Sequence, residues 1–417
     1  MGSPGRLCKM SELCDIGSSK RIYAADYKTD GVPFYRGKEV IEKHLGKLNV
    51  STELYINRAE FEQIRDKFGA PEPGDLLLTS VGTLGIPYIV RRGEEFYFKD
   101  GNLTWFRNFN KLDSRFLYYW LLSPQGRGEL KKCTIGSSQP AFTIVLLKQM
   151  EIELKSISTQ RKIAFILSAY DDLIEKNNRR IKILEIMAQV FYREWFVMFR
   201  FPGHEKVRMA DSDFGQVPEG WDILAFRDLV EINPSMKVDK DKQKPYVDMA
   251  GLSNSCMVIE CSITRNGNSG SKFQNGDTLF ARITPCLENG KTGYVQFLDD
   301  EEIGIGSTEF IVFRSKKLTP EYVYLLARTD NFRGIAIKSM TGASGRQRVQ
   351  NGCFDEIMLP VPPLEILTAF TNMVSPMFKQ VHVLSNKNVN LRRTRDLLLP
   401  KLISGELDVG SLDIDTN

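Results

Sequence analysis

Gly290-Lys291-Thr292 invites a phosphate-binding interpretation of this 417-residue chain. A phosphate-binding loop that ends in such a string needs a further glycine at position 285, because its backbone amides surround the phosphates. Pro285 stands there instead, and proline has no amide hydrogen to donate. The string therefore does not predict a nucleotide site.

Other catalytic constellations are not evident in the sequence. The three histidines have neither the spacing of a zinc protease nor that of a nucleophile with its base. Asn233-Pro234-Ser235 approaches the Asn-Pro-Pro-aromatic run of base methylation but lacks the second proline and the aromatic residue. We therefore expect a non-catalytic protein.

The seven cysteines are odd in number and scattered along the chain. Neither the separation of Cys8 from Cys14 nor that of Cys256 from Cys261 is a zinc-finger spacing. This usage favours reduced thiols in a cytosolic protein. The sequence predicts no metal site.

The composition is that of a folded protein with several domains. It is 42% hydrophobic and 26% charged, with a net charge of +4, which permits nucleic-acid binding without demanding it. The length suggests two to four domains. No apolar run is long enough for a transmembrane helix, so we expect no membrane partner.

An internal repeat with a nearly constant offset covers most of the chain. Each half contains a Gly-Asp pair opening a strand-like run, a glycine-bearing loop, a short helical pattern, a small-residue loop and a second short strand. These features fall at 74–78 and 276–280, 80–85 and 282–290, 114–122 and 319–326, 136–139 and 342–345, and 152–154 and 357–359. The repeat predicts two domains of one architecture.

Each half closes with a long helical pattern in which apolar residues recur every 3.5 residues on average, as in a coiled-coil seam. The first seam is Ile163, Leu167, Tyr170, Ile174, Asn177, Ile181, Leu184, Ala188, Phe191 and Trp195. The second is Leu367, Phe370, Val374, Met377, Val381, Leu384, Asn388, Leu391, Arg395 and Leu398. We expect Pro363 to precede the second helix, Pro400 to stop it, and the single Asn residues to fix the register. Helices of roughly 50–60 Å can cover each other's seams.

Several motifs together resemble the specificity subunits of type I restriction-modification enzymes. The ending 395–407 (RDLLLPKLISGEL) is similar to the end of such subunits, and 160–164 (QRKIA), Leu184-Glu185 and 193–197 (REWFV) are similar to their central conserved region. The connector 218–221 (PEGW) opens the second half as in that family.

The resemblance implies an α/β (α+β) fold. Two globular target-recognition domains related by a pseudo-twofold axis would be separated by two long antiparallel helices that form a coiled coil. The expected boundaries are 1–155 and 222–360 for the recognition domains, 156–198 and 361–402 for the long helices, 199–221 for the connector and 403–417 for the tail.

The resemblance also implies a function and partners. Such a subunit recognises a bipartite sequence in double-stranded DNA and binds two methyltransferase (modification) subunits, which restriction (motor-nuclease) subunits join. No cofactor is expected in this chain, since S-adenosylmethionine, ATP and Mg belong to the partners. The expected location is the prokaryotic cytoplasm, associated with the nucleoid.

DNA recognition needs donors for base edges and cations for phosphates. The strongest candidates are Arg282, Arg346, Gln347 and Arg348, because they lie in or beside glycine-bearing loops. Further candidates are Lys20, Arg21, Arg91, Arg92, Lys131, Lys132, Ser137, Ser138, Gln139 and Lys291.

Two alternatives stay open. The chain could serve another multisubunit restriction-modification system, or it could be a coiled-coil scaffold that binds no DNA.

A second apolar set on the long helices could contact partners or pack beneath the globular domains. That set is Ile166, Leu173, Ile183, Met187, Val190, Ile366, Thr368 and Val389.

Overall fold

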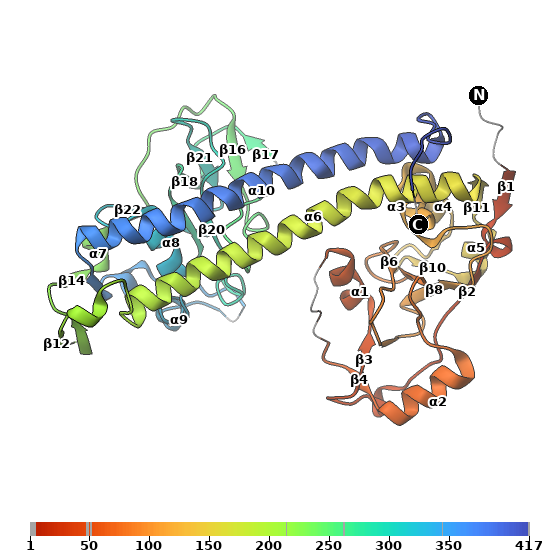
Figure 1. Ribbon diagram of the computed structural model, residues 1–417, viewed down its shortest axis with the longest axis horizontal. Coiled ribbons are helices and arrows are strands. Elements are labelled where there is room, and N and C mark those ends of the chain that lie inside the picture. Colours follow the sequence, from red (N-terminus) through yellow and green to blue (C-terminus); the bar gives the residue numbers. More distant parts are fainter. Residues whose placement is uncertain are drawn as a thin grey trace. The chain divides into compact units, whose positions relative to one another are not determined.

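The computed structural model describes residues 6–46, 50, 52–213, 215–261, 263–343 and 345–415. The chain divides into two units. Unit 1 combines the chain up to Glu175 with the segment from Asn390 onward, and unit 2 is Lys176–Val389. Figure 1 labels many of the helices and strands of both units.

Among the described residues, unit 1 is built on a four-stranded antiparallel sheet and also contains smaller sheets and short helices. The main sheet has the order β2 (Asp15–Gly17), β8 (Leu103–Arg107), β5 (Leu76–Thr79), β6 (Pro87–Ile89). The smaller sheets are β4 (Tyr55–Ile56), β3 (Val32–Tyr35) and β7 (Tyr97–Phe98), then β1 (Arg6–Lys9) with β11 (Glu151–Leu154), and β9 (Thr134–Ile135) with β10 (Ala141–Phe142). The short helices are α1 (Gly37–His44), α2 (Arg58–Phe68), α3 (Ser114–Leu122), α4 (Pro124–Lys132) and α5 (Ile144–Gln149).

Unit 2 repeats this plan. Its matching sheet has the order β15 (Val230–Ile232), β22 (Phe310–Ser315), β19 (Thr278–Ala281), β20 (Thr292–Tyr294). The other strands are β17 (Ile263–Arg265), β16 (Lys244–Val247), β21 (Gly304–Gly306) and β18 (Ser271–Phe273), then β14 (Asp222–Ala225) with β23 (Met358–Val361), and β12 (Met209–Ser212) with β13 (Gly215–Pro218). Its short helices are α7 (Phe226–Leu229), α8 (Pro320–Arg328) and α9 (Asp330–Lys338).

The repeated Gly-Asp pair explains why the two sheets share one register. Gly74 and Gly276 adopt positive φ angles of 98° and 89°, which glycine tolerates best, in the turns that lead into β5 and β19. The following carboxylates accept hydrogen bonds within these turns, Asp75 from the Glu72 amide and Asp277 from the Gln274 amide, both at 2.9 Å. The strands predicted within 74–78 and 276–280 are therefore confirmed as β5 and β19, each beginning two residues after its glycine, and the short helices that follow them are confirmed as α3 and α8.

Two long helices contribute to both units. Helix α6 (Ile157–Tyr192) continues as a π-helical turn over Arg193–Val197, and α10 spans Leu364–Ser404. The predicted start after Pro363 is confirmed. The predicted stop at Pro400 is wrong, because the helix continues to Ser404 and ends before Gly405, whose φ is +83°. Pro400 has no amide hydrogen to donate to the carbonyl of Asp396, one turn earlier. Because Asp396 is exposed, water can bind that carbonyl instead.

The predicted seam residues lie at buried or half-buried positions of α6, of the π-helical turn that follows it and of α10. In unit 1, Ile163 and Leu167 belong to the same core as Leu402. In unit 2, Ile181 and Ala188 belong to the same core as Val374.

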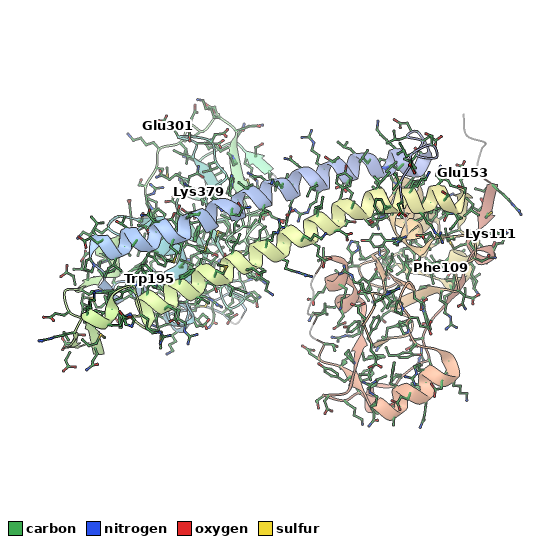
Figure 2. All side chains as sticks on the ribbon, in the orientation of Figure 1. Phe109, Lys111, Glu153, Trp195, Glu301 and Lys379 are labelled. Atoms are coloured by element: carbon green, nitrogen blue, oxygen red, sulfur yellow. The ribbon has the colours of Figure 1, made fainter. Side chains whose placement is uncertain are left out.

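The direction of the helices within unit 2 follows from two contacts. Asn177, early in the α6 part of the unit, donates from Nδ2 to Oδ1 of Asn388, late in its α10 part, at 2.8 Å. Trp195, which is labelled in Figure 2, follows α6. It packs against Phe370 near the start of α10, with ring centroids 5.7 Å apart. The two helices are therefore antiparallel there.

The second apolar set of the helices is divided by the structure. Ile166 and Ile366 are half-buried against the cores of their units. Leu173, Ile183, Met187, Val190, Thr368 and Val389 are exposed. Most of the set is therefore not used for packing beneath the globular domains.

The described residues contain neither a membrane-spanning helix nor a metal-binding cluster. No helix among them is long and apolar enough to cross a bilayer. No group of three or more His, Cys, Asp or Glu side chains in this part of the chain could hold a metal ion.

The buried amide pair in the helix seam gives a testable consequence. Asn177→Leu leaves Oδ1 of Asn388 without its donor, although Nδ2 of Asn388 still donates to Oδ1 of exposed Asn178 at 2.8 Å. Asn388→Leu leaves Nδ2 of buried Asn177 without its acceptor. Each loss of a partner costs about 1–3 kcal/mol. The double variant removes both polar groups, so its free energy of unfolding should return to the native value or exceed it. Denaturant titration of all four proteins measures this coupling. A double variant as unstable as the sum of the single variants would contradict the pairing.

Candidate nucleic-acid interface

In each unit, two loops that the repeat matches in sequence lie side by side. In unit 1 the loop after β5 meets the β9–β10 hairpin, where the Phe142 amide donates to the Ser80 carbonyl at 3.0 Å. In unit 2 the loop after β19 meets the segment after α9, where the Val349 amide donates to the Arg282 carbonyl at 2.8 Å. We call these two arrangements loop pair 1 (residues 80–86 with 134–142) and loop pair 2 (residues 282–291 with 341–349). Ser344 of loop pair 2 lies outside the described residues.

Loop pair 1 presents small polar side chains. Ser137, Ser138 and Gln139 are exposed in the turn of the β9–β10 hairpin. Gly136 permits this turn, because its φ is +83° and a Cβ there would lie 2.8 Å from the Gln139 carbonyl oxygen. The hairpin can therefore offer hydroxyl and amide groups to a ligand without a charged competitor in the turn itself.

Two predicted cations lie just before this hairpin. Lys131 and Lys132 are exposed at the end of α4, and Lys132 forms an ion pair with Glu129 one turn earlier. Cations at a helix C-terminus also interact favourably with the helix dipole. Lys131 is thus the more available of the two for a phosphate.

The remaining candidates of unit 1 belong to other parts of the surface. Arg21 pairs with Asp100 at 2.7 Å, and Lys20 lies over the Phe68 ring at 5.4 Å. Arg91 pairs with Glu175 of α6 at 3.2 Å, whereas exposed Arg92 has no side-chain partner in the described part of the chain. The structure does not bring these four residues into loop pair 1.

Loop pair 2 carries the strongest cationic candidates. Arg346 is exposed, and its side chain makes no hydrogen bond or ion pair with the described residues. Arg348 is paired with Glu309, the shortest distance being 2.6 Å between Nη2 and Oε1. Gln347 is held through its backbone, whose amide donates to Oγ1 of Thr284 at 3.0 Å. The three predicted neighbours therefore differ in how firmly they are placed.

Two predicted contacts are turned inward by the structure. Nη2 of Arg282 donates to the Val349 carbonyl at 3.0 Å, which ties the two segments of loop pair 2 together. Nζ of Lys291 donates to the Met249 carbonyl at 2.6 Å. A side chain that already binds a part-buried carbonyl is a poor DNA contact, because leaving that carbonyl unpaired would carry a desolvation cost. We infer that Arg282 and Lys291 stabilise the fold of the loops instead of contacting DNA.

Two arginines outside the predicted set also hold the loop after β19. Nη1 of Arg328 donates to the Gly290 carbonyl at 2.7 Å, and Nη2 of Arg333 donates to the Glu288 carbonyl at 3.0 Å. The Gly-Lys-Thr string is thus bound by the protein's own arginines. Gly290 of this string has a φ of +81°, which favours glycine, and a Cβ there would lie 3.1 Å from the Asn254 carbonyl oxygen.

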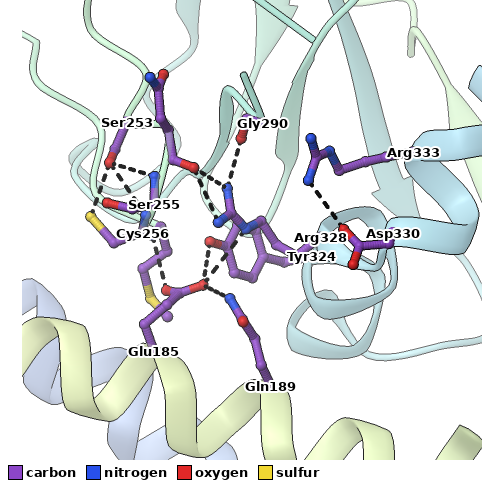
Figure 3. A network of polar contacts seen from close by, with 12 residues as sticks. Glu185, Gln189, Ser253, Ser255, Cys256, Gly290, Tyr324, Arg328, Asp330 and Arg333 are labelled. Carbon is purple, nitrogen blue, oxygen red and sulfur yellow. Dashed lines mark hydrogen bonds and ion pairs between the residues drawn. The ribbon is translucent and has the colours of Figure 1, made fainter. Parts of the chain in front are cut away.

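A buried carboxylate on α6 anchors this region, as Figure 3 shows. Glu185 accepts hydrogen bonds from the Tyr324 hydroxyl at 2.8 Å, the Gln189 amide group at 2.8 Å and the Met257 backbone amide at 3.0 Å. Arg328 lies 3.9 Å away as its cationic partner. Burial raises the pKa of Glu185, and the Arg328 charge and these hydrogen bonds oppose that shift.

Unit 1 contains a similar tie at a different helix position. Tyr119 of α3 donates its hydroxyl to Asp171 of α6 at 2.6 Å, and Arg395 of α10 pairs with the same carboxylate. Helices α3 and α8 begin directly after matching cap residues, so the residue that matches Tyr324 is Tyr118 and not Tyr119. In both units a tyrosine of the matched short helix binds an acid of α6, but no local pattern in the sequence marked either carboxylate partner.

Comparisons with known proteins agree with this architecture. The model of the family "Type I restriction modification DNA specificity domain" matches residues 7–185 and 218–388. The specificity subunit of the type I restriction enzyme MjaIX of Methanocaldococcus jannaschii is 25% identical over 353 residues, which cover 81% of this chain and 79% of that protein.

Two further proteins are similar to parts or to the whole of the chain. The EcoAI specificity subunit of Escherichia coli is 32% identical over 171 residues, which are 38% of this chain and 29% of that protein. The crystal structure of a type I restriction-modification S subunit from M. genitalium superposes with a TM-score of 0.56 at 14% identity, and the match covers 96% of this chain and 97% of that one. The fold is thus shared with a solved S subunit.

The Glu185 network predicts a large effect of a single truncation. Glu185→Ala removes the acceptor of three hydrogen bonds and leaves the Arg328 charge buried, so the free energy of unfolding should fall by about 3–5 kcal/mol. Asp172→Ala, which truncates an exposed acid of the same helix, should change it by less than about 0.5 kcal/mol. Thermal and denaturant unfolding compare the two. Equal stabilities would show that the network does not hold unit 2 to α6.

Proposed function

The chain belongs to the family of type I restriction-modification DNA specificity domains, and on that premise we propose that it binds double-stranded DNA and recognises a target of two separated half-sites. Each unit would read one half-site through its loop pair. The observation that carries this proposal is the duplication itself. Two copies of one backbone arrangement, with different polar side chains, suit two different DNA sequences.

The side chains of the loop pairs support readout of base edges. Hydroxyl and amide groups such as those of Ser138 and Gln139 can bind bases, and arginine prefers guanine. The exposed cations beside them suit phosphate contacts, which fix orientation without carrying sequence information. Each loop pair therefore has donors of both kinds.

The partners follow from the same proposal. Two methyltransferase subunits would dock on the exposed apolar residues of the long helices, among them Ile183, Val190 and Val389, and restriction subunits would join this core. The chain itself would be non-catalytic, with S-adenosylmethionine, ATP and Mg bound by the partners. Its place of action would be the prokaryotic cytoplasm, next to the nucleoid.

The long helices would set the spacing between half-sites. DNA advances about 34–36 Å per helical turn, so two half-sites must present suitable groove faces at a fixed separation. Helices that belong to both units can keep that separation constant, because a paired helix bends far less than a flexible linker. In this way the length of the helices, and not the loop pairs, would determine the untouched spacer.

Two other assignments are separable by experiment. A specificity subunit of another multisubunit restriction-modification system would bind DNA in the same way and differ only in its partners. A scaffold that binds no DNA would lack the counterion release that accompanies neutralisation of phosphates.

The test of DNA binding is its dependence on salt. We expect the full chain to bind a mixed-sequence DNA duplex with an affinity that falls about 10³- to 10⁵-fold between 50 and 200 mM salt, if 6–10 phosphates are contacted. Fluorescence anisotropy measures the slope. The absence of binding, or binding that salt does not weaken, would contradict the proposal.

A second test addresses the spacer. Deleting 174–180 together with 385–391 removes seven residues from each helix and preserves the seam, since both deletions are one heptad long. The helix pair shortens by about 10 Å, so the spacer should shorten by a few base pairs while both half-sites stay the same. Methylome sequencing of cells that carry this variant with its methyltransferase subunit reports the length of the spacer and the sequences of the half-sites. An unchanged spacer would contradict the ruler role of the helices.

A further inference from the structure

Arg348 and Glu309 form a fork at the rim of loop pair 2. Nε of Arg348 donates to both carboxylate oxygens of Glu309, at 2.9 and 3.0 Å, and Nη2 donates to Oε1 at 2.6 Å. The carboxylate therefore occupies one edge of the guanidinium and fixes its plane. Nη1 has no partner among the described residues, and the side chain is 48% exposed.

The backbone of Arg348 and that of Glu309 are both fixed by hydrogen bonds. Arg348 exchanges two hydrogen bonds with Thr341, at 2.9 and 3.0 Å. The Glu309 carbonyl accepts from the Arg282 amide at 3.0 Å, and the Glu309 amide donates to Ser307 Oγ at 3.2 Å. The orientation of the guanidinium is thus set before any ligand arrives, in contrast to Arg346 in the same loop.

The free edge of this guanidinium is complementary to the major-groove edge of guanine. Its Nη1 and Nη2 groups offer two parallel donors, and guanine presents two neighbouring acceptors, O6 and N7, in the major groove. Adenine replaces one of these acceptors with an amino group, which would oppose a fixed donor. A guanidinium whose plane is fixed can discriminate between the two bases, whereas a mobile one can turn to a phosphate.

Unit 1 has the same backbone at these positions but not the same side chains. The Ser80 amide donates to the Asn102 carbonyl at 2.8 Å, as the Arg282 amide donates to that of Glu309. Ala141 forms an isolated antiparallel β-bridge with Val81, as Arg348 does with Ile283. Asn102 and Ala141 thus replace Glu309 and Arg348. The fork is therefore not required by the scaffold, which is expected of residues that distinguish one half-site from the other.

From these observations we propose that Arg348 reads a guanine in the half-site bound by unit 2, and that Glu309 is the positioning residue that orients it. This inference rests on the proposed function and deepens it. The rival explanation is that Glu309 only neutralises Arg348. The two differ in outcome, because loss of a positioning residue reduces base discrimination, whereas loss of a neutralising residue raises affinity for every sequence equally.

The experiment starts with selection of bound sequences by the full chain from a library of randomised DNA duplexes. Binding of the selected duplex and of its single-base variants is then measured for Arg348→Ala, Arg348→Lys and Glu309→Gln, with Arg346→Ala as the matched control. Melting temperatures and recognition of the other half-site show that each variant is folded.

We expect one guanine of one half-site to lose its preference. Arg348→Ala and Arg348→Lys should reduce discrimination at that base about 10- to 100-fold, and Glu309→Gln should reduce it in the same direction, with the other half-site unchanged. Arg346→Ala should weaken binding to all duplexes alike and lower the salt slope by about 1, as for a phosphate contact.

Three results would overturn the inference. Uniform weakening by Arg348→Ala at all bases would make Arg348 a phosphate contact. A uniform gain of affinity with unchanged base preference in Glu309→Gln would reduce Glu309 to a neutralising charge. No enriched sequence with the native chain would contradict the proposed function itself, and this inference with it.

Discussion

The burial of one apolar seam is the constraint on which the rest of the structure depends. Helices α6 and α10 are much longer than ordinary globular helices, and a helix of that length with an apolar stripe is stable only when the stripe is covered. Both units use the same two helices for this purpose, with Leu167 and Leu402 in one core and Ala188 and Val374 in the other. The paired amides of Asn177 and Asn388 add a penalty for any slipped register.

The globular sheets are tied to α6 by polar contacts as well as by apolar packing. Tyr119 binds Asp171 and Tyr324 binds Glu185, so each unit fixes its α3 or α8 helix to an acid on the same long helix. Glu185 is the more demanding of the two, because its charge is buried and must be matched by Arg328 and three donors. Arg328 in turn binds the Gly290 carbonyl, which links α6 to loop pair 2 within the unit.

A repeated scaffold with divergent loops separates stability from recognition. The Gly-Asp turns, the order of the main sheet strands and the backbone hydrogen bonds of the loop pairs are the same in the two units. The side chains that these backbones present differ, with Ser138 and Gln139 in one loop pair and Arg346 and Arg348 in the other. Sequence change at such exposed positions costs little stability, so the two units can diverge in what they bind while they keep one fold.

The sequence by itself determined the repeat, the strands after Asp75 and Asp277, the seams of the long helices and the family, because these are patterns of local spacing and of residue type. Only the tertiary structure decided which cations face outward. Arg282 and Lys291 turn to backbone carbonyls, and Arg348 meets Glu309, a residue 39 positions away. The continuation of α10 through Pro400 was equally hidden, since a helix ends where its unpaired carbonyls can be satisfied and not simply where a proline occurs. Periodicity is a property of neighbouring residues, whereas the partner of a charged side chain depends on where the fold brings distant segments.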